Sequence, residues 1–171
     1  MNPAYDAQSW QGFYIMTGGA AAALAGLLFV AMSLHATTIT QHPFFMSRAV
    51  GTLMSLTSML LIAASVLVPA QPRRWIGIEV EAVAIFFLAV TIRGMIMLGT
   101  RWLSRSRLRA VAETIGGGLW HILFVVAGIS LIFGAGGGFY WLAVVMVFMF
   151  GWNIYTAWML ITEVSEDSEG G

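Results

Sequence analysis

The sequence predicts an all-α integral membrane protein, a bundle of about five transmembrane helices. Composition is the first observation: 59% of the 171 residues are hydrophobic and only 9% are charged, whereas soluble domains carry roughly 25% charged residues. The second observation is that the apolar residues form long runs separated by short polar links. A soluble chain could not cover so apolar a surface with polar groups, whereas lipid solvates it.

A transmembrane helix requires about 20 mostly apolar residues, and the chain contains five runs of this kind. The runs comprise residues 12–34, 49–68, 76–100, 115–133 and 139–161. Pro69 is expected to end the second run, and the glycine-rich link 134–138 predicts a hairpin between the last two runs. We expect one domain over residues 1–164, followed by a disordered acidic tail over residues 165–171.

Arginines in the short links predict the orientation, because basic residues accumulate on the cytoplasmic side of a membrane protein. The link 101–109 contains four arginines, whereas the link before the third run contains only Arg73 and Arg74. Alternation of the spans then places Arg48 on the same side as the link 101–109. We therefore expect a multi-pass cell-membrane protein with its N-terminus outside and its C-terminus in the cytoplasm.

Small residues recur along one side of the first run. Gly18, Ala22 and Gly26 are spaced by four residues, so a helix places them on one face. Such faces allow two helix backbones to approach closely in lipid. Two interpretations remain open: the face contacts another helix of the same chain, or it forms the interface of a homo-oligomer.

A polar stripe follows the second run, with residues three, four and seven positions apart that share one broad helix face. It consists of Arg48, Thr52, Ser55, Ser58 and Ser65. Hydroxyl groups on a membrane helix can donate hydrogen bonds to neighbouring helices or to carbonyls of their own helix. The stripe is therefore interpreted as a contact between helices, and the alternative is a path lined by water or ions.

Polar residues inside the last three runs form the main candidate site. Arg93 and His121 are each expected roughly 9 Å from the inner end of their helix, and Asn153 roughly 12 Å. Because an unsatisfied polar group is unfavourable in lipid, we expect the three side chains to meet inside the bundle, with Glu113 as a nearby partner. This intramembrane cluster is interpreted as a structural clamp, or alternatively as a conduction, proton-relay or ligand site.

Two carboxylates begin the third run. Glu79 and Glu81 are expected to complement the N-terminus of that helix and to pair with Arg73 or Arg74. The alternative is a vestibule that attracts cations.

The sequence predicts neither an enzyme nor a cofactor-binding protein. Zinc-protease, nucleophile-elbow and phosphate-loop motifs are absent, and no aspartate lies in any predicted span. The chain has no cysteine, which excludes disulfides and thiolate metal sites. We expect no metal site and no haem, because His35 and His121 lie at different depths. The formal net charge is zero, so no nucleic-acid partner is expected.

One resemblance concerns the first run only. Trp10, Phe13 and Tyr14, followed by the Gly-, Ala- and Leu-rich segment 18–34, resemble the first span of small uncharacterised bacterial multi-span membrane proteins. Some members of that group are labelled as modulators of a membrane-anchored AAA protease. The resemblance implies a bacterial inner membrane location and a regulatory role, and it carries no catalytic residues over to this chain.

These observations predict a non-enzymatic membrane protein that binds or regulates a membrane partner. Its contacts are expected to be the lipid bilayer and either a second copy of itself or another membrane protein. The alternative is an oligomeric channel or small transporter with a Ser/Thr-lined path and a buried arginine. A dry, interdigitated bundle favours the first function, and a continuous water-filled path along the second span favours the alternative.

Overall fold

The computed structural model describes residues 2–99 and 107–169, without the side chains of residues 43, 95, 97–99, 107–118 and 166–169. Within that part of the chain, helices are connected by short turns and there are no strands. Two short 3-10 helices, Pro3–Tyr5 and Ala7–Trp10, precede the first long helix. The α-helices are α1 (Gln11–Leu34), α2 (Ala36–Gln41), α3 (Pro43–Leu67), α4 (Arg73–Gly99), α5 (Arg107–Phe133) and α6 (Phe139–Glu169).

Proline sets both ends of α3. Pro43 occupies the first turn, where a missing backbone N–H removes no helical hydrogen bond. At the other end, Val68 is extended, with φ −63° and ψ 123°. Because Pro69 follows it, the helical conformation is disfavoured for Val68 and α3 ends at Leu67.

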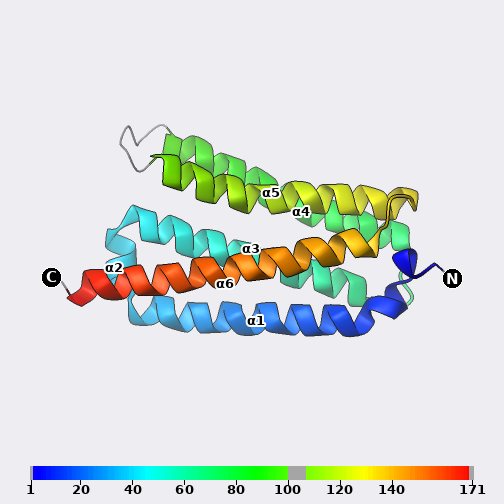
Figure 1. Ribbon diagram of the computed structural model, residues 1–171, viewed down its shortest axis with the longest axis horizontal. Helices are drawn as coiled ribbons and strands as arrows, with labels where there is room; N and C mark the ends of the chain where they lie inside the picture. The colour runs from blue at the N-terminus through cyan, green and yellow to red at the C-terminus, as the bar shows by residue number, and fades with distance from the viewer. Residues whose placement is uncertain (1, 100–106, 170–171) are drawn as a thin grey trace.

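The five long helices run side by side, and the two chain termini lie at opposite ends of the bundle (Figure 1). Helix α3 packs against α1, α4 and α6, and α4 packs along α5 as a hairpin. We call the two ends of the bundle the N-terminal end and the C-terminal end. The start of α4 and the link between α5 and α6 lie at the N-terminal end, and α2 lies at the C-terminal end (Figure 1).

The α4–α5 hairpin separates from the other helices towards the C-terminal end (Figure 1). Burial along α4 follows this divergence, since Ile76, Val80, Ala84 and Phe87 are buried. Beyond Phe87, none of the described α4 side chains is buried. Only the half of α4 nearer the N-terminal end therefore contributes to the central core.

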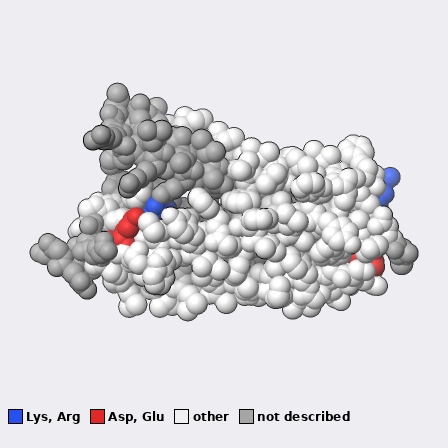
Figure 2. Space-filling view, in the orientation of Figure 1, with Lys and Arg blue, Asp and Glu red and all other residues white. Residues whose placement is uncertain are grey.

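Among the described residues, four helical stretches are long and apolar enough to cross a membrane. They are Ala7–Leu34, Phe44–Leu67, Arg73–Gly94 and Phe139–Ser165, and α5 contains the shorter apolar stretch Leu119–Phe133. On the face shown in Figure 2, charged side chains lie near the two ends and the surface between them is uncharged. Length, composition and charge placement together support a membrane-embedded protein.

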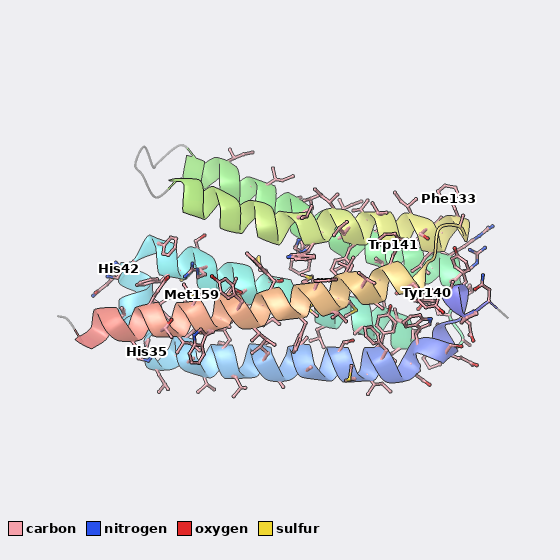
Figure 3. The ribbon with its side chains drawn as sticks, in the orientation of Figure 1. His35, His42, Phe133, Tyr140, Trp141 and Met159 are labelled. Carbon is pink, nitrogen blue, oxygen red and sulfur yellow. The ribbon has the colours of Figure 1, made fainter. Side chains whose placement is uncertain are left out.

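Aromatic and histidine side chains also divide between the ends. Phe133, Tyr140 and Trp141 lie towards the N-terminal end, whereas His35 and His42 lie at the C-terminal end (Figure 3). Tyr and Trp favour membrane interfaces because their rings are apolar and carry one polar atom. Their placement agrees with an interface at the N-terminal end.

Each predicted apolar run falls largely within one of the five long helices, with Val68 just beyond the end of α3 and residue 100 outside the described part. Helices α1 and α4 begin one and three residues earlier than predicted, and three other helices extend further. Helix α3 begins at Pro43 instead of residue 49, α5 begins at Arg107 instead of residue 115, and α6 continues to Glu169. Hydropathy marks only the apolar part of a helix, and charged residues such as Arg and Glu are good helix formers beyond it. The predicted disordered tail therefore begins within helix α6, with residues 170–171 outside the described part.

Candidate functional site

A line of polar side chains joins α3 to α6 and is the largest polar feature inside the bundle. We call it the α3–α6 seam. It consists of Arg48, Thr52, Ser55 and Ser58 on α3, and Asn153, Thr156 and Glu163 on α6. Four of the five residues of the predicted polar stripe belong to it.

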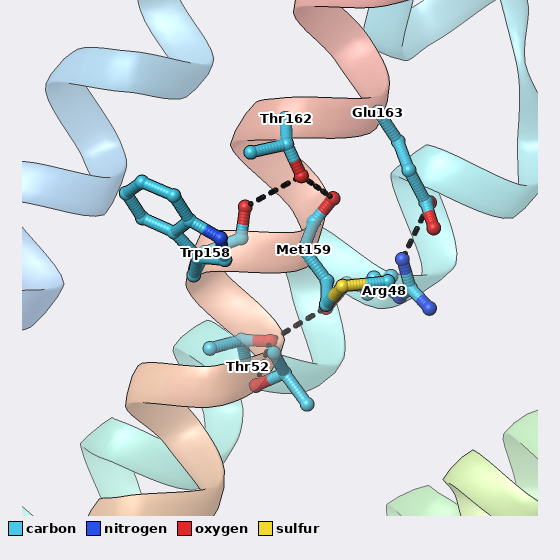
Figure 4. A network of polar contacts seen from close by, with 7 residues as sticks. Arg48, Thr52, Trp158, Met159, Thr162 and Glu163 are labelled. Carbon is cyan, nitrogen blue, oxygen red and sulfur yellow. Dashed lines mark hydrogen bonds and ion pairs between the residues drawn. The ribbon is translucent and has the colours of Figure 1, made fainter.

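The C-terminal end of the seam is an ion pair. Arg48 Nη1 donates a hydrogen bond to Glu163 Oε2 over 2.6 Å, as Figure 4 shows. The Arg48 side chain is 9% exposed and the Glu163 side chain is 33% exposed. The guanidinium also lies 4.9 Å from the ring centre of Phe44, within the range of a cation–π contact. Arg48 is therefore held by charge and by an aromatic face at the edge of the apolar band.

Hydroxyl groups continue the seam towards the membrane centre. Thr52 Oγ1 lies 3.3 Å from Thr156 Oγ1 and 3.0 Å from the Arg48 carbonyl oxygen, so its single proton has two acceptors. Thr156 Oγ1 in turn donates to the Asn153 carbonyl oxygen at 3.1 Å. Each hydroxyl thus has a partner in its own helix or in the facing one.

Asn153 forms the deepest link of the seam. Its Nδ2 atom donates one hydrogen bond to Ser55 Oγ and one to the Met149 carbonyl oxygen, both at 2.8 Å. Ser58 Oγ donates to the Ser55 carbonyl oxygen at 2.7 Å. The Asn153 Oδ1 atom is buried and has no hydrogen-bond partner. One acceptor at the centre of the seam is therefore unsatisfied.

Apolar side chains surround the seam. Leu56, Met59, Met146 and Met149 have no exposed surface, and Met59 Sδ lies 3.7 Å from Asn153 Nδ2. Ser65, which the sequence assigned to the same stripe, is partly exposed and donates to the Leu61 carbonyl oxygen of its own helix. The seam therefore ends near Ser58, and it is characterised by buried side chains and by direct hydrogen bonds between the two helices.

The predicted cluster of Arg93, His121 and Asn153 is not assembled in this structure. Arg93 is exposed, and no hydrogen bond links Arg93 or Asn153 to His121 among the described residues. Arg93 follows Arg73 by twenty residues, which is about 30 Å of helix and equals the thickness of the hydrocarbon core. The predicted cluster was wrong because no described side chain of α4 beyond Phe87 is buried, so Arg93 does not face the core that contains Asn153.

His121 lies instead in the contact between α4 and α5. Its side chain is 4% exposed, and its ring stacks on Phe87 with centroids 5.9 Å apart. Asn153 belongs to the α3–α6 seam described above. Glu113, the fourth predicted member, lies in α5 at a position whose side chain is outside the described part of the chain.

Two glycines bring α4 and α5 together near the N-terminal end. A Cβ atom on Gly77 would lie 2.7 Å from Ile132 Cγ1 and 3.0 Å from the Gly128 carbonyl oxygen. A Cβ atom on Gly128 would lie 2.7 Å from Glu81 Oε1. Gly128 therefore leaves the space that the Glu81 carboxyl group occupies.

Glu81 does not form the ion pair that the sequence predicted. Arg73 donates to the Leu131 carbonyl oxygen at 3.2 Å and lies 5.5 Å from the Tyr5 ring centre. Glu79 accepts a hydrogen bond from Gln71 Nε2 at 2.8 Å. Glu81 Oε1 is buried and has no hydrogen-bond partner. The spacing of Gly77 and Glu81 by one helical turn is the sequence signal that places the carboxyl group on the α5-facing side.

The small residues of α1 divide between two environments. A Cβ atom on Gly18 would lie 2.9 Å from Ala63 Cβ of α3, so Gly18 lies in a close contact within the chain. Ala21 and Leu28 share that buried face. Ala22 and Gly26 are exposed, and a Cβ atom on Gly26 would meet nothing within 4 Å. The predicted stripe is therefore not one packing face in the monomer.

A polar cap closes the N-terminal end, and apart from its glycines no sequence pattern predicted it. Ser130 Oγ accepts a hydrogen bond from Gly138 N at 2.9 Å and donates to the Ala135 carbonyl oxygen. Tyr5 Oη accepts from Gly137 N at 2.9 Å. Gly138, with φ +46°, has Ala4 O only 2.3 Å from the position of a Cβ atom, so only glycine fits.

No known protein family, no curated protein and no solved structure matches this chain. In the described part of the chain, no group of three His, Asp or Glu side chains is placed to hold a metal ion. The features that bear on function are therefore the α3–α6 and α4–α5 contacts and the exposed faces of the helices.

Proposed function

We propose that this protein is a non-enzymatic, multi-pass membrane protein that binds or regulates a partner in the membrane. The observation that carries the proposal is the closed α3–α6 seam, in which Asn153, Thr156 and Thr52 bond directly across or along the two helices. Hydroxyls that bond to protein and are enclosed by apolar side chains stabilise a helix contact, whereas a conduction path needs access to water.

Partner binding is assigned to α1. Only 22% of the apolar segment of α1 is buried in the monomer, compared with 44% of the apolar segment of α3. Ala22 and Gly26 lie on its exposed surface, and small residues of this kind allow close approach of another membrane helix. The resemblance of the first span makes a membrane-anchored AAA protease one partner to test, and a second copy of the chain is the other.

The proposed topology has five spans, with α5 as the fourth. It places the N-terminal end of the bundle outside and the C-terminal end in the cytoplasm of a bacterial inner membrane. The arginine-rich sequence 101–109 supports this orientation. It follows α4 in the chain, α4 runs from the N-terminal end of the bundle towards the C-terminal end, and basic residues accumulate in the cytoplasm. The acidic residues after Glu163 are then available to a cytoplasmic domain of the partner.

The alternative function is a channel or small transporter. The two observations that favour it are the buried Asn153 Oδ1 atom without a hydrogen-bond partner and the Glu81 carboxyl group within a span. Polar groups of this kind inside a membrane often mark substrate or ion pathways. In this function, α3 and α6 would separate during transport and expose the seam.

The experiment that tests partner binding is purification in mild detergent, followed by measurement of the mass of the intact complex. We expect a mass above that of one chain for the wild type, and its loss in Ala22→Leu and Gly26→Leu. Gly151→Leu is the matched control, because Gly151 is an exposed glycine of α6 with open space around a Cβ atom. A single-chain mass for the wild type, or equal masses for all variants, would contradict the assignment to α1.

A further inference from the structure

One carboxyl group of α4 points towards α5 and has a buried oxygen without a hydrogen-bond partner. Glu81 belongs to the candidate span Arg73–Gly94. It follows Arg73 by eight residues, which is about 12 Å along the helix. Its Oε1 atom is buried against α5, in the space that the missing side chain of Gly128 leaves open.

The hydrogen-bond donors around this carboxyl group are too few for a stable carboxylate. A carboxylate in protein is kept ionised by two or three backbone N–H groups or by an opposite charge. The carboxyl group approaches the backbone of Ile129 on α5. The Glu81 side chain is partly exposed, and its Oε1 atom is buried without a hydrogen-bond partner. An ionised carboxylate with an unsatisfied oxygen is strongly unfavourable in an apolar environment.

The charged groups of the neighbouring elements do not supply the missing partner. On α4, Arg73 is engaged by Leu131 and Tyr5, and Glu79 by Gln71. Arg74 and Arg93 are exposed, and among the described residues neither forms an ion pair with Glu81. The one charged residue of α3 is Arg48, which pairs with Glu163 at the other end of the bundle.

Helix α5 carries His121 on the same face as Gly128. The two residues are seven positions apart, which is about 10 Å along the helix. The other charged residues of α5 are Arg107, Arg109 and Glu113, and Glu113 is fifteen positions from Gly128, about 22 Å. None of these positions is adjacent to the carboxyl group of Glu81.

We propose that Glu81 is a proton-binding site within the membrane, and that its carboxyl group is held as the neutral acid between α4 and α5. The ligand is a proton, and Gly128 is the residue that makes room for the protonated group. Ionisation of Glu81 requires water or a cation to enter between the two helices, so gain and loss of this proton are coupled to the separation of α4 from α5. This inference goes beyond partner binding and does not depend on it.

A hydrophobic carbodiimide tests the proposal in phosphatidylcholine vesicles that contain the full chain. The carboxylic acid transfers its proton to a carbodiimide nitrogen, and the carboxylate oxygen bonds to the central carbon. The resulting O-acylurea rearranges to a stable N-acylurea, so the reagent is added whole without a leaving group or a change of oxidation state. Mass spectrometry of peptides then identifies the modified residue.

We expect N-acylurea on Glu81 at neutral pH, loss of the modification as the pH is raised, and no modification at this position in Glu81→Gln. Glu79→Gln is the matched control and should leave the modification of Glu81 unchanged. The infrared C=O band of a protonated carboxylic acid, compared between the wild type and Glu81→Gln, covers the case in which the reagent cannot reach the site. Loss of this band in Glu81→Gln supports the proposal even without labelling, whereas absence of both labelling and a Glu81-dependent band overturns it.

Discussion

Asn153 Nδ2 on α6 donates a hydrogen bond to Ser55 Oγ on α3 at 2.8 Å, ninety-eight residues away in sequence. This contact joins two spans near the centre of the bundle. Because both side chains are buried, the hydrogen bond defines how the two helices are aligned. The sequence predicted that Asn153 would meet Arg93 and His121, whereas its side chain bonds to Ser55 instead.

The first prediction concerns this contact. Ser55→Ala should lower the free energy of unfolding by about 0.6 kcal/mol, the average for a hydrogen bond between membrane helices, and Asn153→Ala should lower it by about 1–2 kcal/mol because it also leaves a cavity. Reversible unfolding in mixed micelles of the single and double variants measures the coupling. Ser33→Ala is the control, since Ser33 is exposed and bonds only to Phe29 of its own helix. Strictly additive effects of the two seam substitutions would contradict a direct contact.

The second prediction concerns the ion pair. Glu163→Gln should destabilise the bundle by about 1 kcal/mol at low salt, because Arg48 loses its carboxylate partner at a site with little solvent. The effect should shrink as the salt concentration rises, because ions screen the charge that is partly exposed. Arg74→Gln, at the opposite end, is the control. The double variant Arg48→Glu with Glu163→Arg restores a pair of opposite charges and should recover part of the stability that is lost when the pair is broken. No recovery would indicate that the packing of Arg48 on Phe44 matters more than the charge.

The third prediction concerns Arg93. Since its side chain is exposed at the C-terminal end of a span, it should extend towards lipid phosphates. Arg93→Lys should then retain the thermal stability of the wild type, because a lysine ammonium group also reaches the interface. A large loss of stability in Arg93→Lys would instead indicate a partner that needs the planar guanidinium group, and would restore the predicted polar cluster.

The fourth prediction separates the two environments of the small residues on α1. Gly18→Leu should lower stability by about 1–3 kcal/mol, because the new side chain would push α1 away from Ala63. Gly19→Leu is the matched control on the next residue, where a Cβ atom would meet nothing within 4 Å. Thermal unfolding in detergent compares them. Equal stability of the two variants would contradict the packing of α1 on α3.

The fifth prediction concerns the space beside Glu81. Gly128→Ala should destabilise the α4–α5 hairpin, because the added methyl group would lie 2.7 Å from Glu81 Oε1. Glu81→Ala should relieve that overlap, so the double variant should be more stable than Gly128→Ala alone. Thermal unfolding of the three variants checks this, and a double variant that is less stable than Gly128→Ala would exclude the contact.

The sequence predicted the helices far better than the contacts between them. Apolar runs and Pro69 located the spans, because the requirement for about 20 apolar residues and the backbone restriction before proline are local. The predicted meeting of Arg93 with His121 and Asn153, by contrast, depended on depths that were counted from predicted helix ends. Beyond Phe87 no described side chain of α4 is buried, which left Arg93 exposed.

The hydrogen-bond partners of the polar residues depend on how each helix is rotated about its axis relative to its neighbour. Residue spacing within one helix does not reveal that rotation. Spacing correctly grouped Thr52, Ser55 and Ser58 on one face of α3. It could not indicate that this face meets Asn153 of α6, or that Gly128 leaves space for Glu81. Both facts require the relative rotation of two helices, which long-range packing sets.

The α3–α6 seam should be closed to water, and because the chain contains no cysteine, a single introduced thiol reports on access to the seam. A Ser55→Cys variant in sealed vesicles is exposed to a membrane-impermeant maleimide from either side. Thr40→Cys, at an exposed position of α2, is the positive control, and denaturation of Ser55→Cys confirms that its thiol is intact. We expect no labelling of Ser55→Cys in the folded protein and full labelling after denaturation. Labelling in the folded protein at a rate near that of Thr40→Cys would contradict the closed seam and favour a water-filled path.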